Sequence, residues 1–102
     1  MNTAEHIADA QAKAEGIRQE LHAAGAKTAR LNLATRVYND LVDMDGQRSE
    51  VRAILEGLQE YLAGGRAALE MQDVKDPLWD RLHALLAPLG AHLAYVEAYG
   101  PE

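Results

Sequence analysis

The sequence predicts an all-α protein, an antiparallel bundle of three to four helices that forms a single domain over residues 1–102. Three observations support this fold class. Apolar residues recur three and four positions apart along most of the chain, which is the repeat of one helix face. Residues 1–76 contain no proline, the residue that most strongly interrupts a helix. A chain of this length also suits one hydrophobic core, because domains usually span ~100–200 residues.

The first half of the chain predicts two helices, over residues 3–24 and 28–43. Asn2 and Glu5 have the spacing of a capping box, and Gly25 stands where a residue that closes a helix is expected. Thr28 is of a type that caps the next helix. The apolar rhythm nevertheless continues through Gly25, and one glycine costs a helix only ~1 kcal/mol. The alternative is therefore a single helix over residues 3–43.

The second half predicts two more helices, over residues 49–71 and 77–99. The segment 43–49 combines Gly46 with turn-forming Asp and Ser residues, so it separates the second helix from the third. Asp76 is a suitable N-cap, and Pro77 fits the first position of a helix. Pro88 removes a backbone donor within the last helix, which predicts a kink or a restart near that residue.

The last helix carries the most apolar surface and is expected to be the centre of the core. Its buried stripe consists of Leu78, Leu82, Leu85, Leu89, Leu93 and Val96. Aromatic side chains lie on the two flanks of this stripe. Such residues often dominate protein interfaces, so Trp79, His92, Tyr95 and Tyr99 form the expected interaction surface. The alternative is that these side chains only border the core of a monomer.

The N-terminal helix indicates self-association, most simply as a homodimer. Its apolar face has three large residues, Ile7, Ile17 and Leu21, and is otherwise alanine. Alanines bury little area at about 25 cal/mol per Å², so this helix adds little to a monomer core. We therefore expect Ile7, Ile17 and Leu21 at a dimer interface. The apolar side of the last helix is also too wide for one neighbouring helix to cover, which supports the same expectation.

The chain is acidic, with a formal net charge of −6. This balance argues against a protein that binds duplex DNA by neutralising phosphates. Charge is uneven, however: residues 13–36 carry five basic side chains against two acids, whereas residues 37–60 carry six acids against two arginines. Direct nucleic-acid binding is therefore a hypothesis that ranks behind the protein-binding and metal-binding functions described below. The cations that would contact the phosphates are Lys13, Arg18, Lys27, Arg30 and Arg36.

No catalytic or cofactor motif is recognisable in the sequence. There is no Cys, and the single Ser49 lacks the Gly-x-Ser-x-Gly setting of a nucleophile. The segment 64–66 differs from a phosphate-binding loop. Aligning Gly46 with the glycine of an EF-hand puts Leu41 and Arg52 at ligand positions, so calcium is not expected there. The sequence predicts neither catalytic residues nor a cofactor.

A metal-binding bundle is the alternative function. His6 with Asp9, and Asp80 with His83, are spaced three apart and so share a helix face. Known two-metal bundles use Glu-x-x-His pairs directed inward, together with further glutamates. Neither pair contains Glu, so surface positions are the simpler expectation for both.

The sequence therefore predicts a non-enzymatic protein-binding module, a small acidic inhibitor, immunity-type or regulatory protein that occludes a protein partner. A partner with a basic surface, such as a nucleic-acid-handling protein, would suit the acidic segment 37–60. The chain contains neither an apolar stretch of about 18 residues nor a recognisable leader, so no membrane association is expected. The lack of Cys favours a cytoplasmic location.

Overall fold

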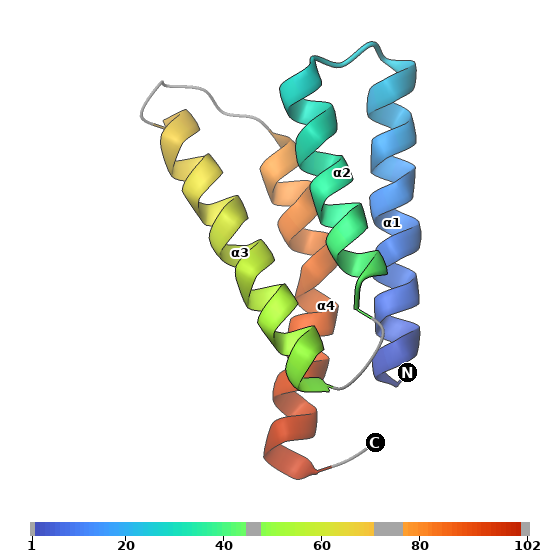
Figure 1. Cartoon of the computed structure of the whole chain (residues 1–102), viewed down its shortest axis with the longest axis vertical. Coiled ribbons are helices and arrows are strands. Elements are labelled where there is room, and N and C mark those ends of the chain that lie inside the picture. The colour runs from blue at the N-terminus through green and yellow to red at the C-terminus, as the bar shows by residue number, and fades with distance from the viewer. Residues whose placement is uncertain (1, 45–47, 71–76, 101–102) are drawn as a thin grey trace.

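The computed structural model describes residues 2–44, 48–70 and 77–100. This part of the chain forms four helices, α1 (Thr3–Ala23), α2 (Thr28–Val42), α3 (Arg48–Glu70) and α4 (Pro77–Tyr99). Each helix runs opposite to the one before it (Figure 1). The all-α antiparallel bundle is confirmed, and every helix end lies within about one residue of its expected position. Asp76, the expected cap of the last helix, lies outside the described residues.

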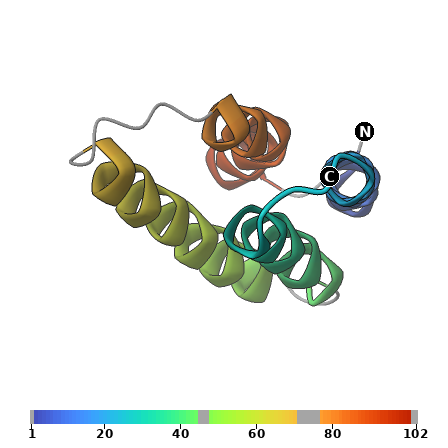
Figure 2. The same ribbon diagram turned by 90° about the horizontal axis from the view of Figure 1, so that it is seen from above.

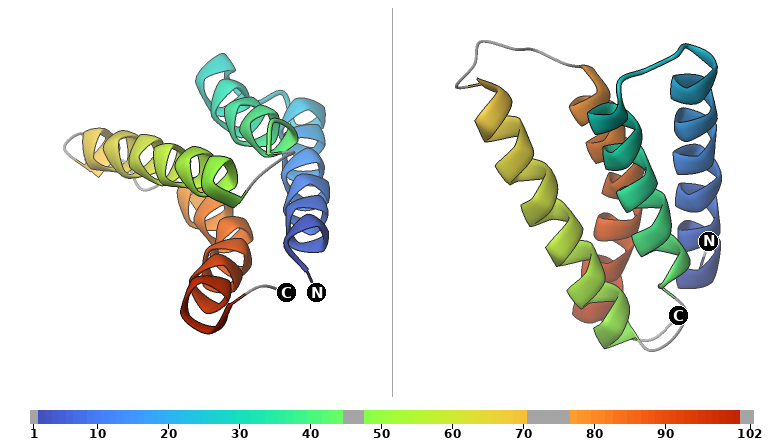
Figure 3. Two further views of the ribbon diagram at one scale, coloured as in Figure 1. Left: turned by 60° about the horizontal axis from the view of Figure 1, so that its bottom comes forward. Right: turned by 45° about the horizontal axis from the view of Figure 1, so that its top comes forward.

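Helix α4 is in contact with all three other helices. Helix α1 packs against α2 and α4, while α3 packs against α2 and α4 from the other side. Figure 2 shows α4 between α1 and α3, with α2 on the opposite side of the core. Helix α3 crosses the bundle obliquely, so that one of its ends lies close to α2 and the other diverges from it (Figure 3).

Two separate helices, and not one long helix, span residues 3–42, so the alternative over residues 3–43 is wrong. Helix α1 closes at Gly25, which has a φ of 68° that only glycine adopts without strain. The Ala26 amide donates to the Leu21 carbonyl at 2.9 Å, and the Gly25 amide donates to the His22 carbonyl at 3.1 Å. These two bonds form a Schellman motif, which satisfies carbonyls at the end of the helix.

The two helix starts in this half differ in their capping. The Asn2 side chain accepts a hydrogen bond from the Glu5 amide at 2.8 Å, and the Glu5 carboxylate accepts one from the Asn2 amide at 3.3 Å. The expected capping box is therefore present. Helix α2, by contrast, is preceded by Lys27 at the N-cap position, without a side-chain cap. Thr28 is the first helical residue and not the cap that its type suggested.

The core includes residues from all four helices. Alanines line the contact between the first two helices, where Ala14 and Ala34 are both fully buried. Small side chains let α1 and α2 approach closely. Alanines bury little apolar area, and most of the buried area comes from larger residues elsewhere in the core. The core leucines, which are at most 5% exposed, include Leu41, Leu58, Leu62, Leu82 and Leu89.

Helix α4 continues through Pro88 without a restart. Its expected stripe is confirmed, since Leu78, Leu82, Leu85, Leu89, Leu93 and Val96 are all buried. Over the described residues, the helices are too short or too polar to cross a lipid bilayer.

An ion pair joins α1 to α4 and gives an expected pH dependence. Arg81 Nη2 donates to Glu20 Oε2 at 2.7 Å, and this hydrogen bond, together with the attraction of the charges, lowers the pKa of Glu20. A carboxylate whose pKa is lower in the folded state stabilises the fold above its unfolded pKa. This contribution is lost as the pH falls through the lower, folded value.

We therefore expect the NMR titration midpoint of the Glu20 carboxyl carbon to lie lower in the native protein than in an Arg81→Gln variant. The variant should also lose less stability between neutral and acidic pH, measured by urea unfolding at several pH values. Identical Glu20 midpoints in the two proteins would show that the pair does not persist in solution, where exposed ion pairs are screened by solvent and salt.

Candidate interaction surface

Two tyrosines are the most exposed large hydrophobic side chains among the described residues. Tyr95 is 63% exposed and Tyr99 is 78% exposed, and both lie on the last turns of α4. Their ring centroids are 4.9 Å apart and the ring planes are inclined by 40°. This end of α4 extends beyond the neighbouring ends of α1 and α3 (Figure 1). The tyrosine pair is thus presented to solvent by a helix whose other side is fixed in the core.

Two histidines, His92 and His6, lie next to this tyrosine pair, on the side of Tyr95 that is nearer to the body of the bundle. His92 lies one turn before Tyr95, and its ring contacts that of His6 in α1, with the centroids 4.5 Å apart and the ring planes inclined by 34°. The Thr3 hydroxyl also forms a hydrogen bond with His92 Nε2 at 2.9 Å. His92 is therefore half-buried and joins α1 to α4. We call His6, His92, Tyr95 and Tyr99 the aromatic row; sequence spacing had not placed His6 in it.

Trp79 does not belong to the aromatic row, although sequence reasoning grouped it with the other aromatic residues. It lies 16 residues before Tyr95 on the same helix, a separation of roughly 24 Å at 1.5 Å per residue. Its ring packs against α3 at Gly65, where an added methyl group would meet the indole. The expected surface therefore divides into a packing residue at one end of α4 and exposed aromatic residues at the other.

The side of α4 that faces away from the core is exposed and uncharged. In the described part of the chain, no other helix covers it in the view along the bundle (Figure 2). Between residues 84 and 96 the sequence has no Asp, Glu, Lys or Arg. We define the outer face of α4 as the exposed residues Ala84, Ala87, Pro88, Ala91, Ala94, Tyr95, Ala98 and Tyr99. An uncharged strip of this length is unusual on a protein surface, where charged side chains normally cover the solvent side of a helix.

The residues expected at a dimer interface are buried within a single chain. Ile7, Ile17 and Leu21 are between 5% and 8% exposed and belong to the common core. Their helix face is covered by α2 and α4, because α2 folds back along α1 after Gly25. In this fold they are therefore largely inaccessible to a second copy. The dimer itself stays a prediction.

The two His/Asp pairs of the metal hypothesis lie far apart. His6 is beside His92, whereas Asp80 is 12 residues before His92 on α4, roughly 18 Å away along the helix axis. Each aspartate also pairs with a cation: Asp9 with Lys13 at 2.9 Å, and Asp80 with Arg66 at 3.1 Å. Within residues 2–44, 48–70 and 77–100, no group of three or more His, Asp or Glu side chains is arranged to hold a metal ion.

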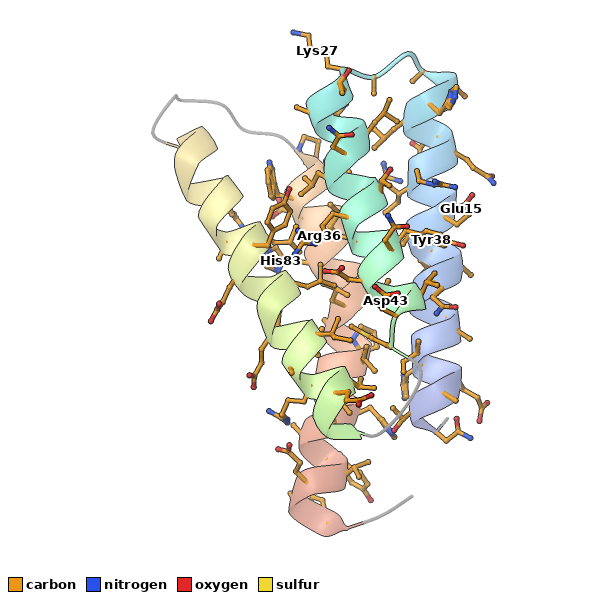
Figure 4. The ribbon with its side chains drawn as sticks, viewed as in Figure 1. Glu15, Lys27, Arg36, Tyr38, Asp43 and His83 are labelled. Atoms are coloured by element: carbon orange, nitrogen blue, oxygen red, sulfur yellow. The ribbon has the colours of Figure 1, made fainter. Side chains whose placement is uncertain are left out.

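Most of the basic side chains of residues 13–36 are engaged within the molecule. Arg18 donates two hydrogen bonds to Glu15, which lower the pKa of Glu15, and its guanidinium lies 5.0 Å from the centre of the Tyr38 ring. Arg36 pairs with Asp40 at 2.9 Å. In Figure 4, Glu15 and Tyr38 lie along the α1–α2 contact, while Lys27 projects from the end of α2. The cationic side chains that would bind phosphates are therefore largely neutralised by neighbouring carboxylates.

An open groove of about 450 Å³ lies between α1 and α2, close to their connection. Its lining residues are Arg18, Gln19, His22, Ala23, Leu31 and Thr35. Arg18 is held by Glu15, so it offers little free charge to an anionic ligand. Four of its six lining side chains are polar, but the groove is open, whereas small-molecule sites usually enclose most of their ligand, so it is a weaker candidate than the outer face of α4.

These features define an all-α four-helix protein whose central helix has an uncharged outer face that ends in two exposed tyrosines. Comparison of the chain with protein-family models, with curated proteins and with solved structures found no match.

Proposed function

We propose that this protein is a non-enzymatic protein-binding module and that it binds its partner through the outer face of α4. The observation that carries the proposal is the exposure of Tyr95 and Tyr99 on the projecting end of that helix. Tyrosine gives a large contact area for little loss of side-chain entropy, and it is enriched among the residues that dominate protein interfaces.

The shape and chemistry of this face suit a protein better than a small molecule. Small-molecule sites are concave and enclose most of their ligand, whereas the outer face is the convex side of a helix. Its alanines let a second helix or a strand approach closely. Because residues 84–96 carry no Asp, Glu, Lys or Arg, the attraction would come from apolar contact and from the tyrosine rings.

The acidic surface beside this face would select among possible partners. Glu50, Glu56 and Glu60 are exposed on α3, and Glu97 is exposed on α4, where it pairs with Arg52. A partner with a basic surface would be attracted to this side of the molecule. The role we infer is that of a small acidic inhibitor, immunity-type or regulatory protein, and nucleic-acid-handling proteins are one class with a suitable surface. Its cytoplasmic location stays a prediction.

Affinity capture with matched variants tests this proposal. The tagged protein, a Tyr95→Ala/Tyr99→Ala variant and a Val42→Ala control would be compared by quantitative mass spectrometry of the captured proteins. Val42 is 46% exposed on α2, so its replacement removes an exposed apolar side chain from a different helix. We expect a specific partner whose recovery falls at least about tenfold with the double variant, since each hot-spot tyrosine is worth more than ~1 kcal/mol, and is unchanged with the control.

The same captured proteins with all three baits would contradict the proposal, provided that circular dichroism shows the double variant to be folded. Loss of the partner only with variants in the α1–α2 groove, for example Leu31→Ala, would place the binding surface there instead.

A further inference from the structure

The outer face of α4 has small residues at one end and large residues at the other. Its first half presents Ala84, Ala87, Pro88 and Ala91, none of which projects far from the helix backbone. Its second half presents Tyr95 and Tyr99, which stand out from it. A second copy of this face would complement it only with the two helices antiparallel. In that orientation the tyrosines of each copy lie over the alanines of the other.

We propose that the partner of this face is a second copy of the chain, bound with the two α4 helices antiparallel about a twofold axis near Ala91. This inference rests on the proposed function of the outer face as a protein-binding surface. In this arrangement Tyr95 of one copy lies over Ala87 of the other, and Tyr99 lies next to Ala84. Each contact occurs twice, as in any interface made of the same surface on both subunits.

Electrostatic repulsion between two copies of the chain would be smaller at this face than over most of the surface. Each chain has a net charge of −6, so most orientations of two copies bring like charges together. The outer face has no formally charged residue between 84 and 96. A twofold pair of such faces buries no unpaired charge.

The size of the contact predicts a modest affinity. The face extends over 16 residues, from 84 to 99, which is roughly 24 Å of helix. Tyrosines contribute at most about 150–250 Å² each, and alanines much less. The total is near or below the ~1,200 Å² at which specific and stable interfaces begin. We therefore expect a reversible dimer with a dissociation constant in the micromolar range or weaker.

Sedimentation equilibrium between about 10 and 500 µM tests for the dimer. The mass should rise from 11.1 kDa toward twice that value. Ala91→Glu should abolish the rise, because it brings two carboxylates together at the axis. Ala91 is exposed, so the variant should fold normally. Ala63→Glu, at an exposed position of α3, is the matched control and should dimerise like the native protein.

Disulfide trapping tests the orientation, since the native chain has no Cys. A mixture of Ala84→Cys and Ala98→Cys proteins should form a covalent heterodimer on mild oxidation, because the two positions are symmetric about Ala91. Neither protein alone should cross-link appreciably, while Ala91→Cys alone should. Cross-linking of each single variant with itself at 84 and 98 would indicate parallel helices and overturn the arrangement.

A mass of 11.1 kDa at all concentrations would overturn self-association. A dimer that survives Ala91→Glu would overturn its location on α4. Neither outcome decides the proposed function: if the chain is monomeric but a different captured protein is still lost with Tyr95→Ala/Tyr99→Ala, the outer face binds that protein and only the second copy is excluded.

Discussion

Replacing Leu82 or Leu89 with Ala is expected to lower the free energy of unfolding by about 2–5 kcal/mol. Both side chains are at most 1% exposed, and they lie on a helix that contacts the other three. Truncation removes buried methyl groups and leaves a cavity that neighbouring side chains fill only in part. A domain of this size is stable by only about 5–15 kcal/mol, so either variant could lose much of its stability.

Urea unfolding followed by circular dichroism measures this loss. Glu56→Ala is the control, because its side chain is 61% exposed and its pair with Arg52 is long, at 3.4 Å. A change within about 0.5 kcal/mol is expected for such a surface substitution. Similar losses for Leu82→Ala and Glu56→Ala would mean that α4 is not the centre of the core.

Gly65→Ala and the adjacent Gly64→Ala are expected to change stability in opposite directions. A Cβ atom at Gly65 would lie 2.3 Å from Cη2 and 2.8 Å from Cζ3 of Trp79, so the indole or the α3 backbone must move. Overpacking of this kind costs typically about 1–3 kcal/mol. At Gly64 an added Cβ meets no atom within 4 Å, and alanine favours a helix over glycine by up to about 1 kcal/mol.

Fluorescence reports the same event directly, because Trp79 is the only tryptophan. Gly65→Ala should shift its emission to longer wavelength as the indole becomes more exposed, and Gly64→Ala should leave the emission unchanged. Two stabilised variants with identical spectra would show that Trp79 does not rest on α3 at Gly65.

The helix positions could be predicted because they depend on local interactions. The capping box at Asn2 and Glu5, the proline at 77 and the three-four apolar rhythm each act within a turn or two of helix. The sequence alone did not decide whether the first helix ends at Gly25, because a single glycine inside a helix costs only ~1 kcal/mol. The packing of α2 back against α1 buries Leu21 and Leu33 and outweighs such a small preference.

The candidate site could be predicted only in part. The spacing of His92, Tyr95 and Tyr99 placed them on one flank of α4, and the structure brings these three together with His6. The partner of His92 lies 86 positions earlier in the chain, and no local pattern links the two residues. Which flank of a helix remains exposed depends on its neighbours: α3 covers Trp79, whereas no described residue covers the end of α4.

By itself, therefore, the sequence determined the helices, their order and the buried stripe of α4, because hydrophobic periodicity and capping are properties of short segments. Only the tertiary structure decided which apolar side chains serve the core of one chain and which remain available to a partner. Ile7, Ile17 and Leu21 are inside, whereas Tyr95 and Tyr99 are outside. Their hydrophobicity does not distinguish them; the difference arises because α2 and α4 cover α1, while none of the helices that the structure describes covers the outer face of α4.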